Sequence, residues 1–372
     1  MILHLITDDK FADYAINQFK EIDNTSRFVL VKPTEATTLS YLKGIENVQQ
    51  LVLNSFEYKE FLKNLHEFSG LIIHGFFYAW QEEFVLSAPY DLKVAWVCWG
   101  GEIYGRNEFE SGFLAPKTKL LHRIKQLKRI LKGRSFRNPE FLVELKSFNR
   151  INFCLTDMVQ EYEFAKRVTN STMRYLWYNY YSIEETVGVL QNKIIQGNNI
   201  LVGNSCTLTN NHLDAFHLLG QFDLEDRKII VPLSYGENWL QKKIIQQGIK
   251  VFRDNFEPLI DFLERDTYNQ YICSASIMIM NHYRPQAQGN IITGLWLGAK
   301  VYLSNKSMTY SHFKEMDAIV FSIEDELKST NPTALTPLSN EDREHNRKIL
   351  MQEYGKENMK SRIQEIINAL NK

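Results

Sequence analysis

The sequence predicts an α/β protein built from two doubly wound, Rossmann-like domains that face a cleft. Short apolar runs suited to buried parallel strands recur along the chain, and most are separated by segments with helical periodicity. The alternation restarts near residue 199, which indicates a second domain. A chain of 372 residues, 44% of them hydrophobic, is long enough for about two domains with sizeable cores.

The first domain is expected over residues 1–182. It opens with a strand at Ile2–Ile6 and an amphipathic stretch that runs to Glu21. The apolar runs that follow, the last of them rich in aromatic residues, are Phe28–Val31, Leu51–Leu53, Leu71–Phe77, Val94–Val97, Ile151–Leu155 and Met173–Tyr180. A polar segment from about Ser182 to Asn198 then crosses to the second domain.

The second domain is expected over residues 183–338. Its predicted strands are Asn199–Val202, Lys228–Pro232, Val251–Phe252, Ser276–Met280, Lys300–Leu303 and Ala318–Phe321. Its predicted helices are 210–220, 239–247, 258–269 and 291–299. Residues 339–372 form one long charged helix that crosses back to pack at the domain junction.

Composition excludes several classes of protein. The net charge of −1 argues against bulk attraction to nucleic acid. Four widely spaced cysteines indicate buried thiols in a reducing compartment rather than a disulfide framework or a zinc site. No secretory signal and no apolar run of membrane-spanning length is evident, so a cytoplasmic protein is expected.

The most informative stretch is the loop from His282 to Asn290, which lies between a predicted strand and a predicted helix. A strand followed by Gly289-Asn290 at a helix start presents backbone N–H groups to an anion. Arg284 can add a bidentate phosphate contact, and His282 a donor if it is protonated. Ordinary helix capping is the alternative interpretation.

Two more loops should meet this one at the carboxyl edge of the second sheet. Gly203-Asn204-Ser205 follows the first strand of that domain, and Tyr235-Gly236 follows the second. Taken singly, each is ordinary turn chemistry. Three such loops on one sheet favour a nucleotide diphosphate site, with Gln286 in the third loop.

The first domain carries a candidate general base. Glu102 follows Gly100-Gly101 after a strand, where it would lie at the rim of the cleft and could deprotonate a sugar hydroxyl. The alternatives are that Glu102 caps the following helix or pairs with Arg106. Asp8 and Asp9, which follow the first strand, are candidates of the same kind, with equally good structural alternatives.

The segment Lys117–Arg137 contains nine Lys or Arg and no Asp or Glu, with apolar residues at helical spacing. This pattern is typical of a cationic amphipathic helix on an anionic membrane surface. A core-facing helix with a solvated basic face is an equally good interpretation. Nucleic-acid binding has no other support in the sequence.

Four segments, in order and spacing, resemble the bacterial TDP-N-acetylfucosamine:lipid II N-acetylfucosaminyltransferase family (glycosyltransferase family 56). The resemblance extends from about residue 1 to about residue 325. The third loop differs from the Gln-Gln-Gly-Ile-Gly type of sequence expected there. The segments are Trp99-Gly100-x-Glu102-Ile103-Tyr104, Leu201-Val202-Gly203-Asn204-Ser205, Ser234-Tyr235-Gly236 and Gln286-x-x-Gly289.

The resemblance implies a GT-B glycosyltransferase with the donor nucleotide on the C-terminal domain, the acceptor on the N-terminal domain and no cofactor or obligatory metal. The pyrophosphate would bind at Gly289-Asn290 and near Gly203–Ser205, with Arg284 stabilising the leaving charge. A fucose-like residue (4-acetamido-4,6-dideoxyhexose or fucose) would pass to a polyprenyl-diphosphate-linked glycan. The enzyme would be peripheral at the cytoplasmic face of the inner membrane, held there by Lys117–Arg137.

Two other functions stay open on the sequence. A nucleotide-sugar epimerase on the same scaffold would need acidic and His groups around the donor sugar, for which His212 and Glu257 are available. A non-catalytic module that binds glycans or nucleotide sugars is the other. Release of nucleoside diphosphate in the presence of an acceptor would distinguish a glycosyltransferase from an epimerase and from a non-catalytic module.

Overall fold

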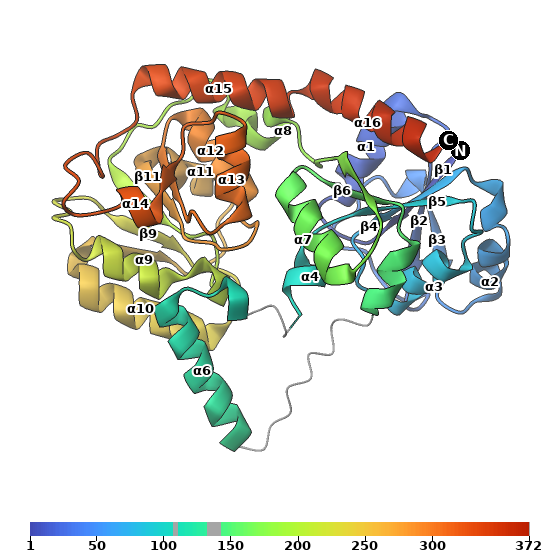
Figure 1. The fold of residues 1–372 in the computed structure, drawn as a ribbon, viewed down its shortest axis with the longest axis horizontal. Coiled ribbons are helices and arrows are strands. Elements are labelled where there is room, and N and C mark those ends of the chain that lie inside the picture. Colours follow the sequence, from blue (N-terminus) through green and yellow to red (C-terminus); the bar gives the residue numbers. More distant parts are fainter. Residues whose placement is uncertain (107–110, 132–142, 372) are drawn as a thin grey trace. The chain divides into compact units, whose positions relative to one another are not determined.

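The computed structural model describes residues 1–106, 111–131 and 143–371. The chain divides into two compact α/β units. Unit 1 comprises Met1–Arg106, Asn138–Ser182 and Tyr354–Lys372, and unit 2 comprises Asn107–Arg137 and Ile183–Glu353. Figure 1 shows that each unit contains a sheet with helices packed against it. Two parallel-sheet α/β units confirm the predicted fold class.

The sheet of unit 1 has seven parallel strands in the order β3-β2-β1-β4-β5-β6-β7. The strands are β1 Ile2–Ile6, β2 Arg27–Lys32, β3 Val48–Val52, β4 Gly70–His74, β5 Lys93–Val97, β6 Phe153–Thr156 and β7 Arg174–Trp177. The helices are α1 Ala12–Ile22, α2 Phe56–Lys63, α3 Ala79–Ser87, α4 Gly101–Tyr104, α7 Val159–Thr169 and α16 Lys356–Leu370.

Both faces of this sheet are buried, as continuous apolar strands require. In β1, Leu3 and Leu5 belong to one core cluster, whereas Ile2 and Ile6 belong to the cluster on the other face. This alternation follows from the two-residue period of a strand. Two cores therefore sandwich the sheet and leave its edges for the loops.

The sheet of unit 2 has six parallel strands in the order β10-β9-β8-β11-β12-β13. The strands are β8 Asn199–Val202, β9 Ile229–Pro232, β10 Phe256–Leu259, β11 Ala275–Met280, β12 Lys300–Leu303 and β13 Phe321–Ser322. The helices are α6 Pro116–Leu131, α8 Ile183–Val187, α9 His212–Leu219, α10 Asn238–Phe252, α11 Arg265–Ser274, α12 Gln288–Leu297, α13 Met308–Glu315, α14 Ile323–Glu326 and α15 Asn340–Tyr354.

The strand order in both units reverses direction next to the first strand, between β1 and β4 and between β8 and β11. In open α/β sheets, ligands bind outside the carboxyl ends of the strands at this switch point. The loops after β8 and β11 therefore occupy the ligand-binding position of unit 2, and the loops after β1 and β4 occupy that of unit 1.

Three predicted elements of unit 2 are wrong in type or position. Residues 251–252 end α10 instead of forming a strand, and the predicted helix 258–269 is replaced by β10 and α11. Pro258 is tolerated in β10 because β10 is an edge strand, where one N–H needs no partner. The last strand is Phe321–Ser322 rather than Ala318–Phe321.

The C-terminal segment returns to the first unit, as predicted, but as two helices. Gly355 adopts an extended conformation (φ −63°, ψ 146°) and separates α15 from α16. In unit 1, α16 lies along α1 (Figure 1) and buries Ile363, Ile366 and Leu370 in the core. A salt bridge of 2.9 Å joins Lys360 to Glu21 at the rim of this contact.

The observed units differ from the predicted ranges in one further place. Residues 111–131, which the sequence analysis assigned to the first domain, group with unit 2. The reason is a set of hydrogen bonds to α9: Asp214 accepts from the backbone N–H groups of Lys117 and Thr118 at 2.8 and 3.0 Å. An acidic side chain at this helix start satisfies N–H groups that the helix itself cannot.

Candidate active site

The three predicted loops of unit 2 meet at the carboxyl edge of its sheet. Gln286, from the loop after β11, donates to Asn204 Oδ1 at 3.1 Å. Asn204 in turn donates from Nδ2 to the Tyr235 hydroxyl at 3.2 Å. The loops after β8, β9 and β11 thus form one hydrogen-bonded surface, in which Thr209 also donates to Gln286 Oε1 at 2.7 Å.

Asn210, which the sequence analysis did not single out, is the hub of this surface. Its Oδ1 accepts from the Asn204 backbone N–H at 2.8 Å and from His282 Nε2 at 2.9 Å. Its Nδ2 donates to Ser205 Oγ at 3.0 Å and to Thr207 Oγ1 at 2.9 Å. Asn210 is fully buried. A polar residue before a helix reads as an ordinary cap, so only the fold reveals that it ties two loops together.

Two of the predicted glycines have structural reasons. A Cβ at Gly203 (φ +69°) would lie 2.6 Å from Asn210 Oδ1 and 2.7 Å from His212 Nε2. A Cβ at Gly236 (φ +127°) would lie 2.1 Å from the Cys206 carbonyl oxygen. Both positions therefore require glycine, because a Cβ at either would collide with neighbouring loop residues.

Gly289 is different. It lies in the first turn of α12, and a Cβ there would meet no atom within 4 Å beyond its own helix backbone and chain neighbours. The N-cap residue Ala287 has a left-handed conformation (φ 60°) and makes no side-chain cap. The start of α12 is therefore a helix N-terminus without a side-chain cap and with open space beside it, which suits an anion.

The charges of the third loop differ from expectation in one residue. His282 is buried, and burial, reinforced by Arg284 and His212, lowers its pKa to about 3. It stays neutral at physiological pH, so it is a fixed hydrogen-bond donor to Asn210 and not the second cation of the loop. Arg284 is half-buried and carries the positive charge. Asn290 donates to the Tyr268 hydroxyl at 2.8 Å, which adds an aromatic residue from α11.

The predicted base Glu102 is not at a rim. It is fully buried, and its Oε1 accepts from Trp96 Nε1 at 2.9 Å and from the Trp99 backbone N–H at 3.2 Å. Burial raises the pKa of this carboxyl to about 7, against the lowering effect of these hydrogen bonds. The expectation of an exposed carboxylate is corrected here. Arg106 donates to the backbone carbonyl of Glu102, at 2.9 Å, rather than pairing with its side chain.

Asp8 and Asp9 also have structural partners. Asp8 accepts from the backbone N–H groups of Ser40, Tyr41 and Leu42, and so holds that loop in place. Asp9 accepts from Thr7 Oγ1 and from the Phe11 backbone N–H, each at 2.6 Å. These bonds place both carboxylates in the loop after β1.

The helix predicted at Lys117–Arg137 is observed over Pro116–Leu131, and residues 132–137 lie outside the described part of the chain. Thr118 and His122 are buried against unit 2, whereas most of the apolar residues of α6 are exposed. Lys125 reaches the second loop: its Nζ lies 2.5 Å from Glu237 Oε2 and 4.0 Å from the centroid of the Trp239 ring.

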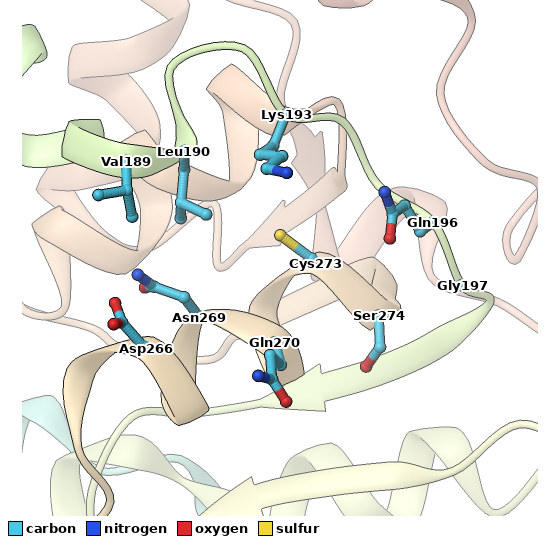
Figure 2. Close-up of a pocket in the computed structure, with 10 residues that line it drawn as sticks. All are labelled: Val189, Leu190, Lys193, Gln196, Gly197, Asp266, Asn269, Gln270, Cys273 and Ser274. Atoms are coloured by element: carbon cyan, nitrogen blue, oxygen red, sulfur yellow. The ribbon is translucent and has the colours of Figure 1, made fainter.

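A cavity of about 480 Å³ lies elsewhere in unit 2, between the segment leading into β8 and one face of α11 (Figure 2). Gly197, two residues before β8, and Ser274, the residue before β11, line it, so it lies toward the amino edge of the sheet, opposite to the three loops. Cys273, one of four free cysteines, also lines it and is half-buried.

Within the described residues, no group of three or more His, Cys, Asp or Glu side chains is placed to hold a metal ion. Over the same residues, no helix has both the length and the hydropathy needed to cross a membrane.

Solved structures share the fold of this chain. HepE of Anabaena, crystallised with UDP and glucose, has a TM-score of 0.60 at 10% identity, over 99% of both chains. A glycosyltransferase from Rickettsia africae has a TM-score of 0.64 at 11% identity, over 100% of this chain and 98% of the other. A UDP-forming trehalose-phosphate synthase from Burkholderia xenovorans has a TM-score of 0.56 at 8% identity, over 100% of both chains. The fold is therefore that of the GT-B glycosyltransferases.

The family follows from the sequence of the second half. Residues 147–346 match the family described as 4-alpha-L-fucosyltransferase, glycosyl transferase group 56. The chain belongs to this family and is a glycosyltransferase.

Proposed function

We propose that this protein transfers a fucose-like residue, a 4-acetamido-4,6-dideoxyhexose or fucose, from a nucleotide-diphosphate donor to a polyprenyl-diphosphate-linked glycan. The family description supports the fucosyl type of transfer. HepE was crystallised with UDP, and the trehalose-phosphate synthase is UDP-forming, which supports a nucleotide-sugar donor.

The observation that carries the proposal is the surface of unit 2 at which three loops join beside the start of α12. The start of α12, at Gly289 and Asn290, has no side-chain cap, and the space beside Gly289 is open. Arg284 adds a cation, and Gln286, Asn204 and Ser205 add amides and a hydroxyl. A diphosphate needs this combination of oriented donors and one positive charge.

The chemistry of the leaving group follows from the same residues. Glycosyl transfer breaks the bond between the sugar C1 and the β-phosphate oxygen, and one further negative charge develops on the departing nucleoside diphosphate. The positive end of the α12 dipole and the Arg284 guanidinium stabilise that charge as it forms. We propose that this replaces a divalent cation and that transfer is independent of metal and of any other cofactor. Tyr235, which is 58% exposed, is available to stack on the base or sugar of the nucleotide.

The surface of α6 supports a membrane-linked acceptor. Four exposed apolar residues follow one another at helical spacing and form a stripe: Leu120, Ile124, Leu127 and Leu131, with exposed fractions of 60%, 42%, 60% and 85%. Exposed Lys117, Arg123 and Lys128 flank this stripe. The arrangement fits an interfacial helix and disfavours the core-facing alternative. We propose that the enzyme is a peripheral protein at the cytoplasmic face of the inner membrane.

A thermal-shift panel tests the donor site. TDP, UDP, GDP and ADP are compared with and without magnesium, and a selective, magnesium-independent rise for one of them is expected. That result would also identify the base of the donor. No shift for any nucleotide would overturn the donor assignment.

Co-sedimentation with anionic liposomes tests the helix. Lys117, Arg123 and Lys128 are changed to Glu, and Lys125 is left intact because it pairs with Glu237. The variant is expected to stay in the supernatant, since each juxtamembrane cation contributes about 1 kcal/mol. The matched control reverses Lys242, Lys243 and Lys250, which are exposed on α10 of the same unit. Equal sedimentation of both variants would reject the membrane helix.

A further inference from the structure

The cavity of about 480 Å³ in unit 2 takes no part in the donor site or in the proposed contact with a membrane. One wall is the segment 189–197, which leads into β8, and the other is α11 (Figure 2). Its volume lies in the range of pockets that hold small molecules. The side chains that line it and the contacts of its two walls indicate a ligand and an effect of that ligand.

The two walls are joined at both ends of α11. Near its last turn, the Gln196 backbone N–H donates to the Cys273 carbonyl oxygen at 2.8 Å. At its first residue, Arg265 Nη2 donates to the Glu185 carbonyl oxygen at 3.3 Å. The walls separate between these two contacts, so hydrogen bonds of the fold hold the hollow open along the length of the helix.

One face of α11 supplies four side chains to the lining. Their spacing of i, i+3, i+4 and i+7 is that of a single helix face. The opposite wall supplies the side chains of Lys193 and Gln196. The four residues of α11 are Asp266, Asn269, Gln270 and Cys273.

Five polar side chains of the lining are available to a ligand. Lys193 and Asp266 bear opposite charges on opposite walls, and the other three are carboxamides. A ligand can bind them without breaking a contact inside unit 2. In the part of the chain that the structure describes, no hydrogen bond or ion pair is made by the side chains of Lys193, Gln196, Asp266, Asn269 and Gln270.

Part of the lining is apolar. Val189 is 72% exposed and Leu190 is buried, and both face Asp266 and Asn269 across the hollow (Figure 2). The half-buried thiol of Cys273 lies in the same cavity. The cavity therefore combines one cation, one anion, three carboxamides and a small apolar surface.

We propose that this cavity binds a short zwitterionic peptide and that the bound peptide strengthens donor binding. Lys193 pairs with the peptide carboxylate, and Asp266 pairs with its ammonium group. The carboxamides match a peptide bond, which offers one donor and one acceptor, and Val189 and Leu190 cover an apolar side chain. A bare anion would be repelled by Asp266, and a neutral sugar would use neither charge.

The effect on the donor site follows from the contacts of α12. At the start of this helix, Asn290 donates to the Tyr268 hydroxyl of α11 at 2.8 Å. Near its end, Trp296 Nε1 donates to the Gln191 carbonyl oxygen, in the other wall, at 2.9 Å. A peptide that ties the two walls together restrains α12 at both ends and pre-organises its start for a diphosphate. This regulation rests on the proposed function, whereas peptide binding does not.

The thiol of Cys273 reports on occupation of the cavity. The full chain is alkylated with N-ethylmaleimide, and the rate at Cys273 is followed by peptide mapping. Burial raises the pKa of this thiol, and Lys193 lowers it in part, so the reaction is run at alkaline pH. Saturating leucyl-leucine is expected to slow alkylation of Cys273 about tenfold, because the bound peptide covers the thiol.

Two modified dipeptides test the charges one at a time. Leucyl-leucine amide lacks the carboxylate, and N-acetyl-leucyl-leucine lacks the ammonium group. Each should need an about fivefold higher concentration to protect Cys273, the effect of one exposed ion pair.

Variants assign each charge to its partner. Lys193→Ala should abolish the difference between leucyl-leucine and its amide, and Asp266→Ala should abolish the difference between leucyl-leucine and its N-acetyl derivative. Each variant is compared with and without peptide, since loss of Lys193 by itself changes the reactivity of Cys273. The matched control is Lys250→Ala, an exposed lysine of α10 outside the cavity, which should keep both differences.

Protection by none of the three peptides, or protection that neither cavity variant changes, would overturn the peptide site. The nucleotide thermal shift on the same preparation tests regulation, and leucyl-leucine is expected to raise nucleotide affinity about fivefold. Protection with an unchanged nucleotide affinity would overturn the regulation. Protection without any nucleotide shift would overturn the proposed function and the regulation with it, and would leave the peptide site supported.

Discussion

The carboxyl edges of the two sheets share a topology and differ in chemistry. In both units the first strand lies in the middle of a parallel sheet and the order reverses beside it. At this position unit 1 presents Phe11, Phe77 and Trp99. Unit 2 presents Asn204, Asn210 and Gln286. One edge offers ring faces, and the other offers amides, hydroxyls and a helix start.

The difference shows that the same sheet topology carries loops of different chemistry. Even the glycines have different uses on the two edges. Gly75 and Gly101 of unit 1 make room for rings, whereas Gly289 of unit 2 leaves space open. A similar backbone thus carries aromatic rings in one unit and an uncapped helix start in the other.

Asn210→Ala is expected to have the largest effect on the hydrogen-bonded loops of unit 2. The change leaves the Asn204 N–H and the His282 Nε2–H without an acceptor, and each buried unpaired group costs about 1–3 kcal/mol. We expect the free energy of unfolding of unit 2 to fall by about 3 kcal/mol and the nucleotide-induced thermal shift to disappear. Urea unfolding and the nucleotide panel measure both.

The exposed Asn64 in unit 1 gives the control, since Asn64→Ala should change neither quantity. Wild-type nucleotide binding by Asn210→Ala would show that the loops do not depend on this hub.

The next largest effect lies beneath the aromatic edge, at Glu102. Its folded pKa of about 7 lies above the ordinary value of 4.5, so the folded state binds the proton more tightly. Stability is then greatest below about pH 4.5 and declines as the pH rises through 7. Ionisation of this one group costs about 3 kcal/mol. Glu102→Gln keeps an acceptor for Trp96 Nε1 and removes this decline.

The measurement is the difference in unfolding free energy between wild type and Glu102→Gln at pH 5 and pH 8, which cancels the contributions of the histidines. The same variant separates a structural from a catalytic role. Retention of transfer activity supports a structural role, and loss of activity with an intact fold would support the predicted base.

The smallest expected effect comes from a comparison of substitutions at two glycines of unit 2, Gly289 and Gly203. Gly289→Val fills open space in the first turn of α12, so the fold should be unchanged while nucleotide affinity drops about tenfold. Gly203→Ala should do the reverse and lower the melting temperature, because its Cβ would collide with the Asn210 and His212 side chains. Equal nucleotide affinity of wild type and Gly289→Val would reject the phosphate position.

The sequence alone predicted correctly those parts of the fold in which the local residue pattern agrees with the topology of the sheets. Apolar runs predicted both sheets, and small polar residues after β8, β9 and β11 predicted loops that the structure brings together. Prediction from the sequence failed where residues distant in the sequence determine the environment of a side chain. Glu102 follows two glycines, a pattern that predicts exposure, but Phe77 from the loop after β4 and Tyr104 of α4 fill the space beside those glycines.

Two other failures have the same origin. Pro258 reads as a strand breaker, yet it lies in an edge strand whose position depends on the whole sheet. The helix α6 follows a segment of unit 1 in sequence, yet Asp214, almost a hundred residues later, binds its first turn. Neither the edge position of Pro258 nor the hydrogen bonds of Asp214 can be recognised from the neighbouring residues in the sequence.

The path of the chain has a practical consequence for work on the separate halves. The chain passes between the units after residues 106, 137, 182 and 353, so neither unit is a contiguous stretch. A fragment ending at residue 182 would lack α16 and expose the face of the sheet on which Ile363, Ile366 and Leu370 pack. An isolated first half would need residues 354–372 grafted onto it, and a deletion of the last helix would damage the half that is synthesised first.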